Sequence, residues 1–430
     1  MKKMITLTMI KNEADIVETF VRYTMNYAYK MVIVDNGCTD GSREILEKLI
    51  EEGFNIEIFT EANVFYEQMF LENKYIRKIN ATEEFDYLVP VDVDEFLYPQ
   101  NGNWSIFEGL PQNQISIIEW KTYCLDEEKS IQNIFEDIDY VRYGVKEFTK
   151  VIIPKSLIRE GFFVTMGHHD VAGIKENERN ICDAIWMAHF PVRSRKQIQF
   201  KVYQGILAQL MSSYHSVVAF HWKDMFIKLK KNEFDVVDYS QKYALKANDI
   251  EPVYKTEKFD ISWCQKSVEP QYNEMINGNM EQLIFSLAEA IVLRYITDGE
   301  NNKRQKLLIY GTGGSAKNLF SYFRPTDYEI VAYVDSDVAK EYHKFNDRII
   351  IGPDKIKYLD FDHIVIASNY RDEIYAKLAQ CNVPKEKIWD KYDLLEKYVN
   401  MGGENAQDIY LGNRRNCPKV NTKLYDTGYV

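Results

Sequence analysis

Segments typical of strands and of helices alternate through the first hundred residues, and this alternation restricts the fold more than any other feature. Apolar runs predict strands at residues 5–10, 31–35 and 55–60. Helical spacing of apolar residues predicts helices at residues 13–29, 43–52 and 66–80. Strands that alternate with helices form a parallel sheet, and continuous apolar strands such as MVIV (31–34) need cover on both faces. The predicted fold class is therefore α/β.

The rest of the chain changes character twice. After further strand-like runs, the pattern is mostly helical from 196 to 300 and includes the amphipathic stretch MEQLIFSLAEAIVLRYI (280–296). The polar stretch 298–306 is typical of a linker, and a second, small Rossmann-like α/β unit begins at Leu307. The predicted division is a first α/β domain at 1–205, a helical region packed on it at 206–300, a Rossmann-like domain at 306–395 and a tail at 396–430.

Composition and charge exclude several classes of protein. The formal net charge of −12 argues against a nucleic-acid binder, which needs a basic face. The six cysteines form no C-x-x-C pair and fit a reducing cytosol. The apolar run near the N-terminus is too short for a signal peptide, and no run reaches the roughly 18 residues of a membrane span. We expect a cytoplasmic protein; peripheral contact with the inner face of the cell membrane and a homo-oligomer stay open.

The stretch LVPVDVDEFL (88–97) places Asp92, Asp94 and Glu95 directly after an apolar run. Ligands of open α/β sheets bind at the carboxyl ends of the strands. Two carboxylates spaced i and i+2 there suit a hard divalent cation, Mg²⁺ or Mn²⁺, that also takes oxygens from substrate phosphates. Such a cation would neutralise charge that is costly to bury. The competing interpretation is a solvated acidic loop.

The second predicted strand also ends in a carboxylate. Asp35 at that strand tip could accept hydrogen bonds from a nucleotide base or ribose. The following Asp40-Gly41-Ser42 predicts only a turn and the cap of the next helix.

Several ordered motifs make the chain resemble a known enzyme family. KNEAD (11–15), VDNGCTDGS (34–42) and DYLVPVDVDEF (86–96) together resemble a family-2-type glycosyltransferase of the GT-A fold, in the branch where Glu-Phe follows the D-x-D. Further segments that resemble this branch are KVIIPKSLI (150–158), GHHD (167–170) and HFPVRSRKQIQFK (189–201). The likeness spans about residues 4–205. It implies transfer of a sugar from a nucleotide-sugar donor to a glycan or lipid-linked acceptor, with Mn²⁺ or Mg²⁺ as cofactor.

The resemblance also implies roles for individual residues. The implied metal ligands are Asp92, Asp94 and His189. The implied donor-binding residues are Asn12, Glu13, Asp35, Asp92, Arg193 and Lys196. Arg193 suits a bidentate phosphate contact. Arg195, Lys196 and Lys201 are otherwise expected to be surface charges, with Lys196 also within reach of a phosphate.

The acceptor hydroxyl needs a general base if the anomeric centre inverts, and inversion is what the resemblance favours. A carboxylate is the usual base, and the candidates are Asp170, Glu119 and Glu95. Trp120 and Tyr123 could offer a sugar an aromatic face, or could be core. His168 and His169 are open between acceptor contact and structure.

A glycine-rich stretch, YGTGGSAKNLF (310–320), opens the second α/β unit. Gly311, Gly313, Gly314 and Asp335 approach a dinucleotide fingerprint, in which glycines let the backbone meet a pyrophosphate. Lys317 stands where a third glycine or alanine is expected. The unit resembles small Rossmann-like domains appended to bacterial surface-polysaccharide enzymes. Nucleotide binding and a purely structural role both stay open.

These features predict a metal-dependent glycosyltransferase of bacterial capsule or lipopolysaccharide synthesis. Two alternatives stay open. In one, the C-terminal unit is a nucleotide-sugar-modifying oxidoreductase, which bound NAD would indicate. In the other, the chain is a non-catalytic nucleotide-sugar-binding scaffold, which donor turnover would exclude.

Overall fold

The computed structural model describes residues 2–61, 68–211, 220–245, 250–276, 304–317, 319, 328–346, 348–391 and 393–394. The helix expected at 280–296, most of the linker and the tail at 396–430 lie outside these residues. Within them, no helix combines the length and apolar character needed to cross a membrane.

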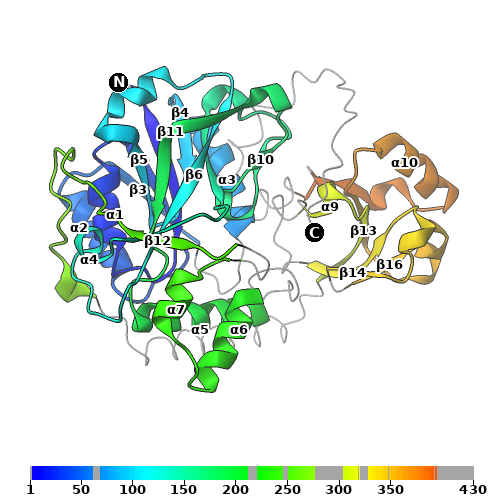
Figure 1. Ribbon diagram of the computed structural model, residues 1–430. Helices are drawn as coiled ribbons and strands as arrows, with labels where there is room; N and C mark the ends of the chain where they lie inside the picture. Colours follow the sequence, from blue (N-terminus) through cyan, green and yellow to red (C-terminus); the bar gives the residue numbers. More distant parts are fainter. Residues whose placement is uncertain are drawn as a thin grey trace.

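Ten strands form one mixed sheet in the N-terminal unit (Figure 1). Eight follow the order β12-β7-β6-β8-β4-β1-β2-β3, while β11 pairs with β6 and also with β5. Their bounds are β1 Met4–Ile10, β2 Lys30–Asp35, β3 Ile56–Thr60, β4 Tyr87–Pro90, β5 Glu95–Pro99, β6 Ile115–Cys124, β7 Tyr140–Tyr143, β8 Thr149–Pro154, β11 Arg179–His189 and β12 Val253–Thr256. Strands β1 to β4 pair in parallel, whereas β8 joins β4 and β6 antiparallel. The unit is thus mixed α/β.

Helices cover both faces of the parallel part of this sheet (Figure 1). α1 (Val17–Thr24) and α2 (Ser42–Glu51) pack on one face, together with Ile33 of β2. α3 (Gln68–Thr82) packs on the other face, together with Val34. Because successive side chains of a strand point to opposite faces, the apolar run of β2 is buried on both sides, as its sequence predicts.

Asp92 and Asp94 lie in a tight turn between β4 and β5, and Glu95 begins β5. β4 ends at Pro90, two residues before Asp92. The Glu95 N–H donates to the Asp92 carbonyl oxygen at 3.1 Å and closes the turn. β5 then pairs antiparallel with β11, and Glu95 stands opposite His189. This reversal brings His189 beside the motif.

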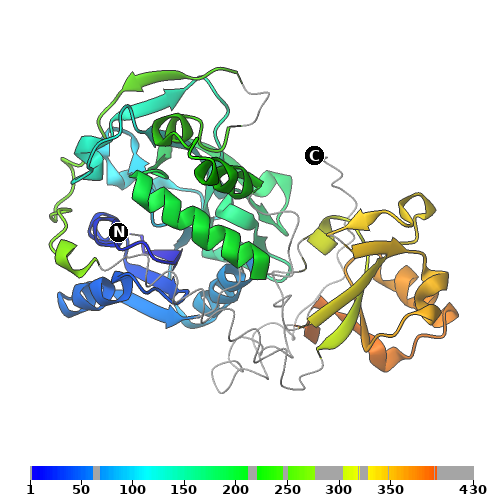
Figure 2. The ribbon, with the colours of Figure 1, turned by 90° about the horizontal axis from the view of Figure 1, so that it is seen from below.

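The region after β11 is helical only in part. It contains α5 (Arg195–Met211), α6 (Phe220–Lys230) and α7 (Val236–Gln241), shown in Figure 2. The expectation of a mostly helical segment from 196 to 300 fails at β12, which pairs antiparallel with β7. Its sequence, VYKT, is rich in β-branched and aromatic residues, which favour strands.

A second sheet of six strands forms in the C-terminal unit, in the order β15-β16-β14-β13-β17-β18. The bounds are β13 Gln305–Tyr310, β14 Tyr328–Val334, β15 Lys344–Phe345, β16 Arg348–Ile351, β17 His363–Ile366 and β18 Ile388–Asp390. The short α9 (Gly314–Lys317) follows β13, and α10 (Arg371–Gln380) follows β17. All pairs except β15·β16 are parallel. This unit is also α/β.

Candidate active site

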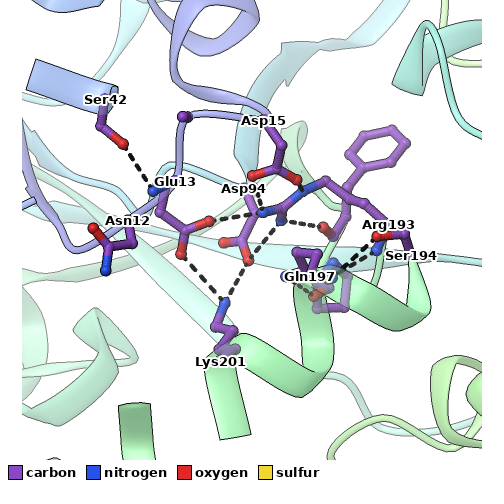
Figure 3. A network of polar contacts seen from close by, with 12 residues as sticks. Asn12, Glu13, Asp15, Ser42, Asp94, Arg193, Ser194, Gln197 and Lys201 are labelled. Carbon is purple, nitrogen blue, oxygen red and sulfur yellow. Dashed lines mark hydrogen bonds and ion pairs between the residues drawn. The ribbon is translucent and has the colours of Figure 1, made fainter. Parts of the chain in front are cut away.

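The loop after β1, the β4–β5 turn, the end of β11 and the start of α5 meet at one place. Figure 3 shows Glu13, Asp15, Asp94, Arg193 and Lys201 converging there. The carboxyl ends of β1, β2 and β4 lie side by side because these strands pair in parallel. The site therefore occupies the edge of the sheet at which α/β proteins bind their ligands.

Three basic side chains surround the Asp94 carboxylate. Lys201 Nζ lies 3.1 Å from Asp94 Oδ2, and Arg193 Nη1 lies 3.7 Å from the same oxygen. His189 Nε2 lies 3.9 Å from Asp94 Oδ1. Asp94 is almost fully buried, at 3% exposure, so these neighbours take the place of water around its charge.

Arg193 ties the first loop to the end of β11. Its Nε donates to Asp15 Oδ2 at 2.7 Å, and its Nη2 donates to Glu13 Oε2 at 2.7 Å. Its Nη1 also donates to the Phe190 carbonyl oxygen at 3.2 Å. All three guanidinium nitrogens are engaged, and Arg193 is 2% exposed. Arg193 is therefore a buried link between the first loop and the end of β11. The bidentate phosphate contact expected from the sequence would require it to leave these partners.

Burial and charge set the protonation states around Asp94. Burial opposes ionisation of Asp94, but Lys201 and Arg193 outweigh it, so the pKa of Asp94 lies below its ordinary value. Burial lowers the pKa of His189 to about 3. Burial also raises the pKa of Glu13 to about 7, against the attraction of Lys201. At neutral pH the site therefore holds an ionised Asp94 beside a neutral imidazole.

The loop that contains Glu13 is held by the second βα connection. The Ala14 N–H donates to Asp40 Oδ2 at 2.9 Å, and the Glu13 N–H donates to Ser42 Oγ at 3.0 Å. Asp40 and Ser42 thus position the loop, although their sequence predicted only a turn and a helix cap. The loop turns before the helix begins, which is why α1 starts at Val17 and not at residue 13.

Asn12 and Asp35 lie in the same two connections. Asn12 Oδ1 accepts a hydrogen bond from the Thr39 N–H at 2.7 Å. Asp35 is buried at the end of β2, where its Oδ1 accepts from the Cys38 N–H at 2.8 Å. Both predicted donor-binding residues therefore lie at the ligand edge of the sheet, with part of their hydrogen-bonding capacity used to shape the loops.

A second ionic cluster lies on the other side of the motif and centres on Lys150. Lys150 Nζ is 2.7 Å from Glu95 Oε1 and 3.1 Å from Asp92 Oδ2, and it donates to the Gly167 carbonyl oxygen at 2.7 Å. Gln68 Nε2 donates to the other Asp92 oxygen at 3.2 Å. The fully buried Lys150 thus supplies the positive charge that the sequence led us to expect from a metal ion at Asp92.

Glu72, Asp92 and His168 offer three potential ligand atoms that all lie within 4.8 Å of one another. Glu72 and His168 contact each other directly, and both are buried. Because Asp92 also accepts from Lys150 and Gln68, this group is a neutralised ionic cluster as it stands. The sequence left His168 open between acceptor contact and structure, and in the structure it is buried beside Glu72 and Asp92.

Two lysines of α5 lie in different surroundings, and only Lys201 differs from the expected surface position. Lys201, expected at the surface, reaches inward to Asp94, because α5 turns its side chain back toward the β4–β5 turn. Lys196 is exposed on α5, and no contact with Asp94 or its partners is found for it in the described part of the chain. Residue type and spacing do not distinguish two lysines five positions apart on one helix.

The three candidate bases are separated by the fold. Asp170 forms an ion pair with Arg179 and accepts from the Val171 N–H at 2.7 Å. Glu119 is exposed on β6, and Glu95 is fully buried against Lys150. None of the three lies among the groups that contact Asp94.

Two aromatic side chains complete the surroundings of His189. Trp120 stacks on its ring, with centroids 4.1 Å apart, and Tyr243 meets it edge-on at 5.5 Å. Arg142 holds the Tyr243 backbone by donating to its carbonyl oxygen at 2.7 Å. Tyr243 stands 54 residues beyond His189 in the sequence, in a segment without a motif, and sequence reasoning missed it.

Tyr123 is fully buried in the core, where it stacks on Phe190.

The glycine-rich stretch of the C-terminal unit lies at the ends of β13 and β14. Gly311 has a φ of 118°, and a Cβ there would lie 2.5 Å from the Ala367 carbonyl oxygen, so this position requires glycine. A Cβ at Gly313 or Gly314 would meet no described atom within 4 Å. Asp335 contacts Thr312 and pairs with Lys340 at 3.0 Å. Nucleotide binding at these residues stays a prediction.

Comparisons with known proteins place few constraints on the chain. A protein-family model described as C2185-like, N-terminal, matches residues 303–389. No curated protein matches the chain.

Several solved structures match parts of the chain at low identity. TarS (residues 1–349) from S. aureus is 12% identical, with a TM-score of 0.27, and the match covers 57% of this chain and 75% of that one. The mannosyltransferase PcManGT from Pyrobaculum calidifontis, in complex with GDP-Man and Mn²⁺, is 14% identical at a TM-score of 0.22, covering 29% and 36%. Glucosyl-3-phosphoglycerate synthase from Mycobacterium tuberculosis is 12% identical at 0.20, covering 28% and 44%. These TM-scores are too low to assign a function.

The guanidinium geometry of Arg193 can be tested separately from its charge. Arg193→Lys keeps the charge but loses the parallel contacts to Asp15 and Glu13, so we expect it to lower the free energy of unfolding by about 2 kcal/mol. Arg195→Lys is the matched control, because Arg195 pairs with Glu128 at the surface and should matter by less than about 0.5 kcal/mol. Urea unfolding followed by tryptophan fluorescence measures both. Equal losses would show that Arg193 is not a structural tie.

Proposed function

We propose that the N-terminal unit is a glycosyltransferase of the GT-A type that uses a divalent cation, Mn²⁺ or Mg²⁺, held by Asp94 and His189. It would transfer a sugar from a nucleotide-sugar donor to a glycan or lipid-linked acceptor, in bacterial capsule or lipopolysaccharide synthesis. The observation that supports this most is that the buried Asp94 carboxylate lies 3.9 Å from the His189 imidazole at the ligand edge of the sheet, beside a partly exposed lysine.

The two proposed ligands fit a divalent cation. Asp94 Oδ1 and His189 Nε2 lie 3.9 Å apart. A carboxylate oxygen and an imidazole nitrogen are donor types that would hold Mn²⁺ or Mg²⁺. The lowered pKa of His189 keeps its imidazole neutral, which leaves a nitrogen lone pair for coordination. Asp92 is not included as a ligand here, since Lys150 and Gln68 already contact its oxygens.

When bound, the cation acts as a Lewis acid that offsets the charge gathering on the diphosphate leaving group. The protein supplies further positive charge from Lys201, whose side chain is 30% exposed and can turn from Asp94 toward a phosphate. Arg193 fixes the loop that contains Glu13 and Asp15 against the end of β11. Asn12 and Asp35, at the ends of β1 and β2, remain the proposed contacts to the donor nucleoside.

The proposal assigns no general base. Glu95 cannot meet an acceptor while Lys150 and the core enclose it, and Asp170 is engaged by Arg179. Glu119 and Trp120 are neighbours on β6, so their side chains point to opposite faces of the sheet. Trp120 lies on the face of His189, and Glu119 therefore points away from the proposed metal position.

A donor screen tests the proposal directly. The purified chain, with Mn²⁺ or Mg²⁺, is mixed with UDP-, GDP-, CMP- and dTDP-sugars, and release of the nucleotide is followed with and without EDTA. We expect one donor to be turned over, slowly to water in the absence of acceptor, and EDTA to stop the release. Absence of release from every donor, with a dinucleotide retained through purification, would instead favour chemistry at Gly311 to Gly314.

A further inference from the structure

A chain of aromatic rings leads from the proposed metal position to the protein surface. Trp120 stacks on His189 and also contacts His169 and Phe148, with ring centroids 5.2 Å and 5.5 Å away. His169 and Phe148 stack on each other at 4.6 Å and an interplanar angle of 28°. One ring, Trp120, thus separates the stacked pair from His189.

Exposure increases along this chain. Trp120 is 8% exposed, His169 is partly buried, and Phe148 is 37% exposed. A single exposed phenylalanine is ordinary on a protein surface. Here, however, the exposed ring is stacked on a second ring and belongs to a series that ends at His189, one of the two proposed metal ligands.

The backbone holds the His169 ring in place. His169 Nδ1 lies 3.0 Å from the Thr149 carbonyl oxygen, and Thr149 Oγ1 donates back to the His169 carbonyl oxygen at 2.8 Å. Gly167 has a φ of 70°, and a Cβ there would lie 2.7 Å from His169 Nε2. The ring therefore rests against a position that only glycine fills without displacing it, and binding would lose little freedom at this side chain.

The chemistry of these rings favours a sugar over a charged ligand. Burial lowers the pKa of His169 to about 4, so its ring is neutral at pH 7. Lys150 Nζ lies 5.2 Å from the Trp120 ring centre but is committed to Asp92 and Glu95. A phosphate would find no uncommitted charge among these groups. The apolar C–H face of a pyranose, in contrast, packs well on neutral aromatic faces, with its hydroxyls left to polar neighbours.

A further observation concerns the buried ring. The Trp120 Nε1–H is buried, and no acceptor is found for it among the described residues. A buried indole N–H usually has a hydrogen-bond partner. A small shift of the rings around a bound hydroxyl would supply one.

We propose that Phe148 and His169 form an aromatic platform that binds the acceptor as a sugar ring, next to the Asp94–His189 pair. This inference rests on the proposed glycosyl transfer and specifies its acceptor: a pyranose held by stacking, and not a lipid phosphate held by charge.

Binding is tested first, without turnover. Saturation-transfer NMR on the full chain uses methyl β-D-glucopyranoside, methyl β-D-galactopyranoside and methyl N-acetyl-β-D-glucosaminide as probes. We expect at least one probe to bind with saturation strongest on its C–H face, Phe148→Ala to weaken it about tenfold, and Phe148→Tyr to retain it. Phe226→Ala is the matched control, because Phe226 is 40% exposed on α6. Absence of binding by every probe, or equal binding by Phe148→Ala, would overturn the inference.

Turnover then separates this inference from the proposed function. With the donor found in the screen, Phe148→Ala should lower the ratio of transfer onto the methyl glycoside to hydrolysis by water about tenfold. An unchanged ratio would overturn the platform while leaving the transferase intact. Glycoside binding that depends on Phe148, in a protein that turns over no donor, would support the platform and reject the proposed transfer.

Discussion

Asp94→Asn is expected to lower metal-dependent release of nucleotide by about a thousandfold, the largest loss we predict for any single substitution. The amide keeps the shape of the side chain but removes the charge that Lys201, Arg193 and a cation share. Because Lys201 is partly exposed and Arg193 retains Asp15 and Glu13, the variant should remain folded. Nucleotide release with the selected donor measures the effect, and Mn²⁺ binding by electron paramagnetic resonance shows its cause.

Two variants make this test specific. Asp92→Asn should keep Mn²⁺ binding, because Lys150 and Gln68 contact the Asp92 oxygens. Asp183→Asn, at an exposed position of the strand that ends in His189, should change neither activity nor binding. The reverse result, with Mn²⁺ binding lost in Asp92→Asn and kept in Asp94→Asn, would reject Asp94 as the ligand.

Lys150→Met is expected to cost about 3–5 kcal/mol of unfolding free energy, because it leaves the fully buried Glu95 and the partly buried Asp92 without their counter-charge. Burial opposes ionisation of Asp92, but the charge of Lys150 outweighs this and holds the pKa of Asp92 well below its usual range. A carboxylate with a depressed pKa contributes stability above its unfolded-state pKa, and that stability is lost as the pH falls. Chemical denaturation of wild type and variant at several pH values measures the difference.

The pH dependence identifies the cause of that loss. The difference between wild type and Lys150→Met should be largest near about pH 8 and should shrink toward about pH 4, as the orphaned carboxylates take up protons. Lys146→Met removes an exposed lysine four residues away and should leave the unfolding free energy unchanged at every pH. A deficit for Lys150→Met that stays constant across this range would point to lost packing and not to unpaired charge.

Much of the N-terminal unit could be predicted from the sequence, for local reasons. The runs that became β1, β2 and β3 are rich in apolar residues and were recognisable as strands, and the continuous apolar run of β2 indicated cover on both faces. Position at the carboxyl end of a parallel strand placed Asp35, Asp92 and Asp94 at one edge without reference to coordinates. The strand VYKT (253–256), short and surrounded by helical patterns, gave too little periodic signal to be recognised.

The charge partners were not predictable in this way. Lys150, Lys201 and Tyr243 come from a strand, a helix and an irregular segment that are distant from the motif in the sequence. Whether Asp92 meets a metal or a lysine depends on which face of β8 turns toward the β4–β5 turn, and pairing with β4 and β6 decides this. Sequence spacing therefore identified the acidic motif but not its counter-ions.

The sequence by itself determined an α/β chain with carboxylates at a ligand-binding edge, because the periodicity of strands and helices is a local property and their alternation implies a parallel sheet. Only the tertiary structure distinguished the two aspartates of the motif, pairing Asp92 with buried Lys150 and Asp94 with His189, Arg193 and Lys201. The physical reason is that electrostatic energy in a buried site depends on distances of a few ångströms, which are set by long-range strand pairing.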